Sequence, residues 1–88
     1  ALQLGLVTKV VTAEELPGVV AELARTLADG PTLAYGSIRR AVAYSAGHDL
    51  TSSLAHESEL MSLTGQSEDH QAAVAAFLAK EKPVFHGR

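Results

Sequence analysis

The chain has 88 residues, of which 47% are hydrophobic and 19% charged, a composition typical of one small globular domain. Its 7 basic and 10 acidic residues give a net charge of −3, which argues against a nucleic-acid partner because such partners require a surplus of Lys and Arg. The lack of cysteine excludes disulfide scaffolds, thiolate zinc sites and cysteine nucleophiles, and no apolar run has the length of a membrane span.

The first eleven residues combine a helix end with a strand pattern. Gly5 is typical of the residue that follows a helix, which assigns Ala1 to Leu4 to a last helical turn. The segment Leu6 to Val11 is short and β-branched, and it predicts a strand. A chain that opens with the end of a helix and an unpartnered strand is expected to continue a longer structure.

The first complete helix is expected to begin near Thr12. Thr12 and Glu15 have the spacing of a capping box, and an apolar stripe at helical spacing starts at Leu16. Pro17 conflicts with this start because a proline inside a helix lacks the N–H that a helical bond requires. The helix therefore either bends at Pro17 or begins later, and it stops at Asp29 to Pro31.

Three further helices are indicated by the residues at their ends. Their starting residues are Pro31, Asp49 and Ser67, and their ending residues are Gly47, Gly65 and Pro83. The fold class is therefore expected to be all-α, a small bundle of about four helices in residues 12–88, with a short strand-like arm in residues 1–11.

No arrangement of side chains predicts a catalytic or a metal site. Ser67, Asp69 and His70 include the residue types of a hydrolase triad, but within one helical turn their side chains diverge, and helix capping and the helix dipole explain Ser67 and Asp69. His48 and His56 are eight residues apart, which places them about 80° from a common helix face. We therefore expect neither nucleophilic catalysis nor bound metal.

Glu57 borders the apolar stripe of the third helix, and two roles are open to it. A carboxylate beside a core face can act as a general base with a raised pKa. Such a residue more often pairs with a cation across a helix interface, and Arg39 and Arg40 are available. The pairing is the favoured interpretation.

Phe77 and Lys80 in the fourth helix also have two interpretations. Lys80 and Lys82 near the helix end suit the negative end of the helix dipole, and Phe77 suits the core. Phe77 and Lys80 also lie three residues apart, so a ring and an ammonium group can emerge on one face. That pair would suit a nucleotide-like group, the ring against a base and the cation against a phosphate.

The order of segments along the chain resembles a known family. The chain opens with ALQLGLVTKVV and closes with SEDHQAAVAAFLAKEKPVFHGR, and LPGVVAELARTLADGP and the Leu54 to Glu57 stretch lie between them. This ordered set resembles the C-terminal region of the crotonase (enoyl-CoA hydratase/isomerase) superfamily, whose enzymes act on acyl-CoA thioesters. The resemblance covers essentially all 88 residues.

The resemblance implies that the catalytic glutamates and the oxyanion hole lie upstream of Ala1. Residues 1–11 would then be a remnant of the catalytic core, and residues 12–88 the C-terminal helical domain, inactive alone. The implied partners are that core, the other subunits of a trimer or hexamer, and acyl-CoA, whose coenzyme A is part of the substrate and not a separate cofactor. By position, Phe77 would flank the adenine and Lys80 would approach the phosphates; Glu81 departs from the family, where Arg is common.

Two other classes of function compete with this interpretation. One is a self-standing helical protein-interaction module, and the other is a complete small enzyme, which the lack of a convergent acid–base pair argues against. Within the resemblance, hydratase or isomerase is the default reaction, and the composition suggests a cytoplasmic protein.

Overall fold

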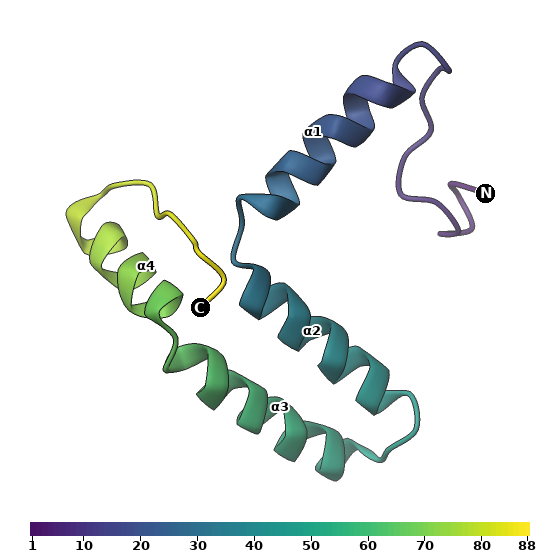
Figure 1. Ribbon diagram of the computed structural model, residues 1–88. Coiled ribbons are helices and arrows are strands. Elements are labelled where there is room, and N and C mark those ends of the chain that lie inside the picture. The colour runs from purple at the N-terminus through teal and green to yellow at the C-terminus, as the bar shows by residue number, and fades with distance from the viewer.

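The computed structural model describes residues 1–88 and contains four helices and no strand (Figure 1). The helices are α1 (Leu16–Ala28), α2 (Thr32–Ser45), α3 (Leu50–Gly65) and α4 (Glu68–Ala79). Helices α2 and α3 pack side by side as an antiparallel hairpin, α4 meets the end of α3, and α1 extends away from the other three (Figure 1). The all-α expectation is confirmed. None of the helices combines the length and apolar character needed to cross a bilayer.

The start of α1 resolves the conflict between the capping box and the proline. The box forms: the Thr12 N–H donates to the Glu15 carboxylate at 3.1 Å, and the Glu15 N–H donates to Thr12 Oγ1 at 3.3 Å. Regular helix nevertheless begins only at Leu16, which makes Pro17 the second helical residue. The N–H groups of the first helical turn make no hydrogen bond within the helix, so a proline there loses none. The later start therefore removes the cost of placing Pro17 inside the helix.

Side-chain caps begin α3 and α4 as the sequence predicts. The Ser52 N–H donates to Asp49 Oδ1 at 2.7 Å, and the His70 N–H donates to Ser67 Oγ at 3.1 Å. Pro31 differs by one position, because it is the N-cap of α2 and Thr32 is the first helical residue.

The turn at Gly5 has the geometry of a helix C-terminus. Gly5 has a φ of 72° and donates its N–H to the Leu2 carbonyl at 3.1 Å, while the Leu6 N–H donates to the Ala1 carbonyl at 3.0 Å. These two bonds make a Schellman motif, the arrangement that ends many helices with a left-handed glycine. The helix-end prediction for Gly5 therefore matches the structure.

Helix α4 ends with the same motif, earlier than expected. The Lys80 N–H donates to the Phe77 carbonyl at 3.1 Å, and the Glu81 N–H donates to the Ala76 carbonyl at 2.8 Å. Lys80 has a φ of 57° and is the one residue other than glycine in the left-handed region. The prediction that Pro83 ends this helix was wrong, because the reversal at Lys80 ends it first.

The strand prediction for Leu6 to Val11 was also wrong. The segment is irregular, because the chain provides no second strand to complete a ladder of backbone hydrogen bonds. The arm instead runs past α1, where Val11 lines an apolar hollow of about 470 Å³ together with Leu16, Val20 and Leu23. The β-branched pattern of the segment therefore has no sheet to join within these 88 residues.

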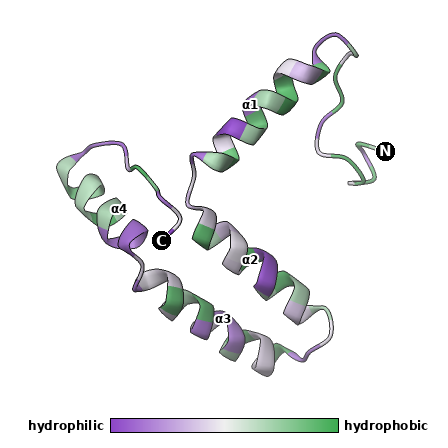
Figure 2. Cartoon of the chain, in the orientation of Figure 1, coloured by the Kyte–Doolittle hydropathy of each residue, from purple (hydrophilic) through white to green (hydrophobic).

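The chain buries very little of its apolar surface. Leu60 is the one buried hydrophobic residue, and apolar positions lie in the open along the N-terminal arm and all four helices (Figure 2). The accessible surface is 7219 Å², whereas a compact monomer of this mass exposes about 4,900 Å². The Cα radius of gyration is 16.7 Å, against about 12 Å for a compact domain, and the chain forms a plate of 42 × 40 × 18 Å.

We expect the 88-residue chain, produced alone, to bind a hydrophobic dye and to melt broadly, because it exposes more apolar surface than a stable monomer tolerates. Amide exchange in Leu6 to Val11 should be complete before exchange in α2 and α3. Dye fluorescence, calorimetry and exchange measurements would test this, with light scattering as the control for association. A sharp, cooperative melt of a proven monomer that binds no dye would contradict it.

Candidate functional site

The two ends of α4 carry the candidate site residues. Ser67, Asp69 and His70 lie at its N-terminal end, and Phe77 and Lys80 lie at its C-terminal end. The structure separates these groups by the length of the helix. It gives each end a different environment, one closed by the C-terminal tail and one open to solvent.

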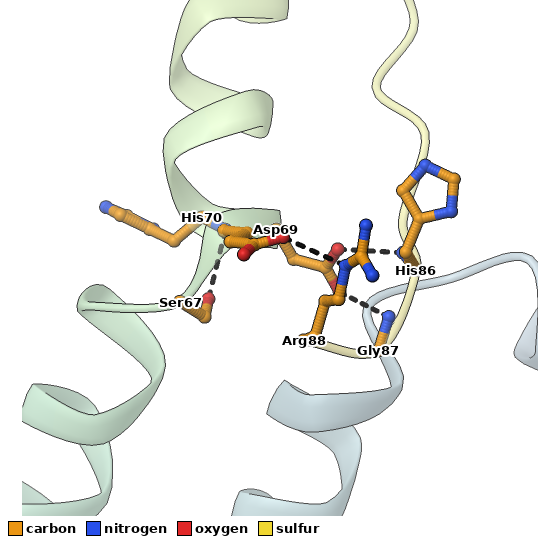
Figure 3. A network of polar contacts seen from close by, with 7 residues as sticks. Ser67, Asp69, His70, His86, Gly87 and Arg88 are labelled. Atoms are coloured by element: carbon orange, nitrogen blue, oxygen red, sulfur yellow. Dashed lines mark hydrogen bonds and ion pairs between the residues drawn. The ribbon is translucent and has the colours of Figure 1, made fainter.

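Asp69 fastens the C-terminal tail to the start of α4. Its side chain is buried, and its carboxylate accepts the His86 N–H at 2.7 Å and the Gly87 N–H at 2.8 Å (Figure 3). The Asp69 N–H in turn donates to the Arg88 carbonyl at 2.8 Å. The tail thus makes three hydrogen bonds with one residue.

The docked tail joins α4 to the beginning of α2. Phe85 lines a hollow shared with Pro31, Leu33 and Ala73. Gly87 has a φ of 77°, and a Cβ at this position would lie 3.2 Å from Thr32 Oγ1, so the backbone passes close to α2. The C-terminus therefore lies between α4 and the start of α2 (Figure 1).

The environment of Asp69 favours its charged form. The N–H of His86 above all lowers the pKa of Asp69, burial works in the opposite direction, and the N–H of Gly87 lowers it further. By contrast, the ion pair of Arg88 with Glu68 at 2.9 Å is exposed at both residues, where such pairs add little stability.

The residues of the apparent triad have separate roles. Ser67 Oγ accepts the His70 N–H and donates to the Thr64 carbonyl, while the His70 ring points away from Asp69 (Figure 3). Capping explains Ser67 as expected, but for Asp69 the expectation was incomplete, because its carboxylate binds the tail. In the sequence, Gly87 was the one signal that the backbone of the tail passes close to another part of the chain.

Phe77 and Lys80 share one turn at the open end of α4. The Phe77 side chain is 80% exposed, and its carbonyl accepts the Lys80 N–H. Because α4 ends at Ala79, Lys80 lies beyond the helix. The expectation that Phe77 and Lys80 share a helical face was therefore wrong. A backbone turn, and not helical spacing, brings the two residues together.

A stack of three rings at the α2–α3 turn has no counterpart in the sequence analysis. Tyr44 lies between His48, at 3.6 Å between ring centroids, and His56, at 4.2 Å. His48 Nδ1 also lies 2.6 Å from the Tyr44 carbonyl oxygen. The four-residue spacing of Tyr44 and His48 was the available signal.

The expected pairing of Glu57 with Arg39 or Arg40 was wrong. Arg40 donates to Ser37 Oγ at 3.2 Å, and Arg39 lines a hollow with Tyr35 on the α1 side of α2. Glu57 lines a different hollow, between α2 and α3. Neither arginine is within ion-pair distance of Glu57, although Arg40 is bonded to Ser37, which lines the same hollow as Glu57.

Comparison with known proteins decides the family. Residues 1–88 match the family described as enoyl-CoA hydratase/isomerase. The chain belongs to this family. One member, the 1,2-epoxyphenylacetyl-CoA isomerase of Escherichia coli (strain K12), is 37% identical over 84 residues, which are 96% of this chain and 32% of the relative. The probable enoyl-CoA hydratase of Rhodobacter capsulatus is 33% identical, with 100% of this chain and 34% of the relative covered.

A solved member of the family has the same arrangement of helices. The putative enoyl-CoA hydratase/isomerase of Mycobacterium abscessus is 41% identical and superposes with a TM-score of 0.95, over 100% of this chain and 34% of that one. The chain therefore spans about a third of the length of its relatives, which is consistent with the C-terminal region of this family. Its open arrangement is one that a longer family member also has.

Asp69→Asn should release the tail, because an amide carries no charge and turns its NH2 group toward donors. In the intact protein we expect amide exchange at His86 and Gly87 to accelerate about tenfold or more. Glu68→Gln, which removes the exposed ion pair beside it, is the matched control and should leave exchange nearly unchanged. Equal exchange in the two variants would contradict the role of Asp69.

The same contact should respond to acid in one direction. Because folding lowers the pKa of Asp69, its stabilising effect is complete above the ordinary carboxyl value of 3.8 and is lost as the pH falls below it, through the lowered pKa. Tail exchange in the unsubstituted protein, corrected for intrinsic rates, should therefore rise in that window. Asp69→Asn should remove this rise.

Proposed function

We propose that this chain is the C-terminal helical domain of an enzyme that acts on acyl-CoA thioesters. In this proposal the catalytic glutamates and the oxyanion hole belong to a core that precedes Ala1, residues 1–11 are the end of that core, and residues 12–88 cover it and contribute to a trimer or hexamer. The observation that carries the proposal is the match of all 88 residues to a third of a longer enzyme, in a chain that buries one apolar residue.

The exposed surface supports a covering role. The chain exposes about 2,300 Å² more than a compact monomer of its mass. A standard protein interface buries about 800 Å² on each partner, so the excess is about three times that area. An interaction module that folds by itself would bury a core of its own, and this alternative lacks such support.

The names of the relatives support the substrate class. They include an isomerase of 1,2-epoxyphenylacetyl-CoA, a short-chain-enoyl-CoA hydratase of Clostridium acetobutylicum and a 2,3-dehydroadipyl-CoA hydratase of Escherichia coli. Each name contains a CoA thioester, while the acyl groups and the reactions differ. The proposed reaction is therefore the hydration or isomerisation of an acyl-CoA thioester.

We propose further that Phe77 flanks the adenine of coenzyme A and that Lys80 approaches its phosphates. A left-handed conformation costs a residue other than glycine about 1–2 kcal/mol, and the equivalent turn at Gly5 has the glycine that avoids this cost. A lysine at position 80 is therefore unfavourable for the backbone, which supports a role for its side chain. Glu81 weakens the positive field beside it, and Lys82 offsets that loss.

Activity of the full-length protein tests the proposal as a whole. We expect it to hydrate or isomerise at least one member of a panel of enoyl-CoA thioesters. The reaction is monitored by the change in absorbance of the double bond conjugated with the thioester, and the product is identified by mass spectrometry. The 88-residue chain should be inactive on the same panel. A full-length protein that transforms none of these thioesters would contradict the proposed function.

Lys80→Gly in the full-length enzyme separates the cation from the backbone turn, because glycine keeps the left-handed conformation without strain. We expect KM for the acyl-CoA to rise several-fold with little change in kcat, since the lost contact stabilises substrate and transition state alike. Lys80→Arg, which keeps the charge, is the control and should stay close to the unsubstituted enzyme. If Lys80→Gly leaves KM unchanged, the side chain does not contact the substrate.

A further inference from the structure

Helix α4 is attached to the other helices near its N-terminal end. It follows α3 after the two-residue link of Gln66 and Ser67, and its first turns meet the end of α3 and line a hollow with the start of α2 (Figure 1). Its 12 residues place the far end of the helix about 18 Å from this junction. A pivot of about 10° at the junction would therefore move the far end by about 3 Å.

The C-terminal tail gives the far end of α4 a second attachment. The tail leaves the helix at Lys80 and runs back toward the start of α4 (Figure 1). On this path residues 82–85 line a hollow with Ala28 and Asp29 at the end of α1, and Phe85 lines another hollow with the start of α2. The tail thus links the far end of α4 to α1 and α2.

Asp69 closes this second attachment. Only 4% of Asp69 is exposed, and its carboxylate accepts the N–H groups of His86 and Gly87 (Figure 3). Hydrogen bonds to an ionised carboxylate are stronger than bonds between neutral groups, and burial keeps water from competing for them. The one side-chain ion pair of the tail, Arg88 with Glu68, is exposed at both residues. Asp69 is therefore the residue that holds the end of the tail.

We propose that Asp69 is a positioning residue for the nucleotide part of coenzyme A, and that it acts from the opposite end of α4. By holding the tail, Asp69 keeps α4 from pivoting and keeps Phe77 and Lys80 in place at the far end. This inference rests on the proposed function, which places these two residues against the adenine and the phosphates. A displacement of about 3 Å would break the contact of Lys80, because an ion pair requires its atoms within about 4 Å.

Steady-state kinetics of the full-length protein with two substrates test this role. For the acyl-CoA, Asp69→Asn should raise KM several-fold with little change in kcat, because contact with the nucleotide stabilises substrate and transition state alike. For the N-acetylcysteamine thioester of the same acyl group, which has no adenine and no phosphate, kcat/KM should stay unchanged. Glu68→Gln removes the same charge from the neighbouring residue and is the matched control, which should leave both substrates unaffected.

A purely structural role of Asp69 gives a different result. Asp69→Asn would then lower kcat/KM for both thioesters by the same factor, which overturns the proposal. An unchanged KM for the acyl-CoA overturns it as well. Deletion of residues 86–88 removes the two N–H donors and leaves Asp69 in place, so it provides a second variant if Asp69→Asn folds poorly. This deletion should raise KM for the acyl-CoA by a similar factor, and an unchanged KM would again overturn the proposal.

Combination with Lys80→Gly shows whether Asp69 acts through the far end of α4. If release of the tail already breaks the contact of Lys80, the double variant should have the KM of Asp69→Asn alone. If the two fold-changes multiply, Asp69 acts independently of Lys80 and the proposal is wrong.

Calorimetric titration with coenzyme A alone gives a readout that needs no turnover. The Kd should rise several-fold in Asp69→Asn and stay unchanged in Glu68→Gln. A full-length protein that binds coenzyme A in this pattern but transforms no enoyl-CoA would contradict the proposed reaction and support the role of Asp69. An equal Kd in the two variants would overturn the role of Asp69, whatever the activity of the protein.

Discussion

The fold depends on apolar surface that the chain cannot cover by itself. Helices of 12 to 16 residues are marginal in water and gain most of their stability from tertiary packing. Here α2 and α3 pack on one another, whereas α1 has the N-terminal arm beside its apolar stripe and meets α2 near its own end, where Leu27 and Tyr35 line one hollow. The sequence thus specifies each helix locally and leaves most of the burial to other surfaces. A helical layer of this kind fits the proposed place of the chain within a longer protein of the enoyl-CoA hydratase/isomerase family.

The polar contacts of the tail connect helices that share almost no hydrophobic core. Most side-chain hydrogen bonds in the structure join residues three or four positions apart, but those from His86 and Gly87 to Asp69 cross 17 and 18 positions. They connect the last residues of the chain with α4, and Phe85 extends the connection to the start of α2. A buried carboxylate that accepts two backbone N–H groups is satisfied without a counter-ion, so this closure needs no partner outside the chain.

The sequence predicted the features that depend on near neighbours. The caps at Asp49 and Ser67, the capping box at Thr12 and the turn at Gly5 each involve residues within one or two turns, where residue type largely determines the geometry. The errors arose where distant residues decide. The Leu6 to Val11 arm has strand propensity but no strand beside it, and no rule of spacing connects Asp69 with residues 86–88. Among the candidate site residues, Phe77 and Lys80 were found from the sequence, but the left-handed turn between helix and tail was not.

The 18 Å thickness of the plate has a mechanical consequence. An α-helix with its side chains is about 10–12 Å across, so the layer is less than two helices deep. The two broad faces are therefore built from the same helices, with almost no interior between them. Surfaces bound to the two faces would be separated by the thickness of a single helix. Rotation of one helix by a fraction of a turn therefore displaces side chains on both faces together, so that a change at one face is felt at the other.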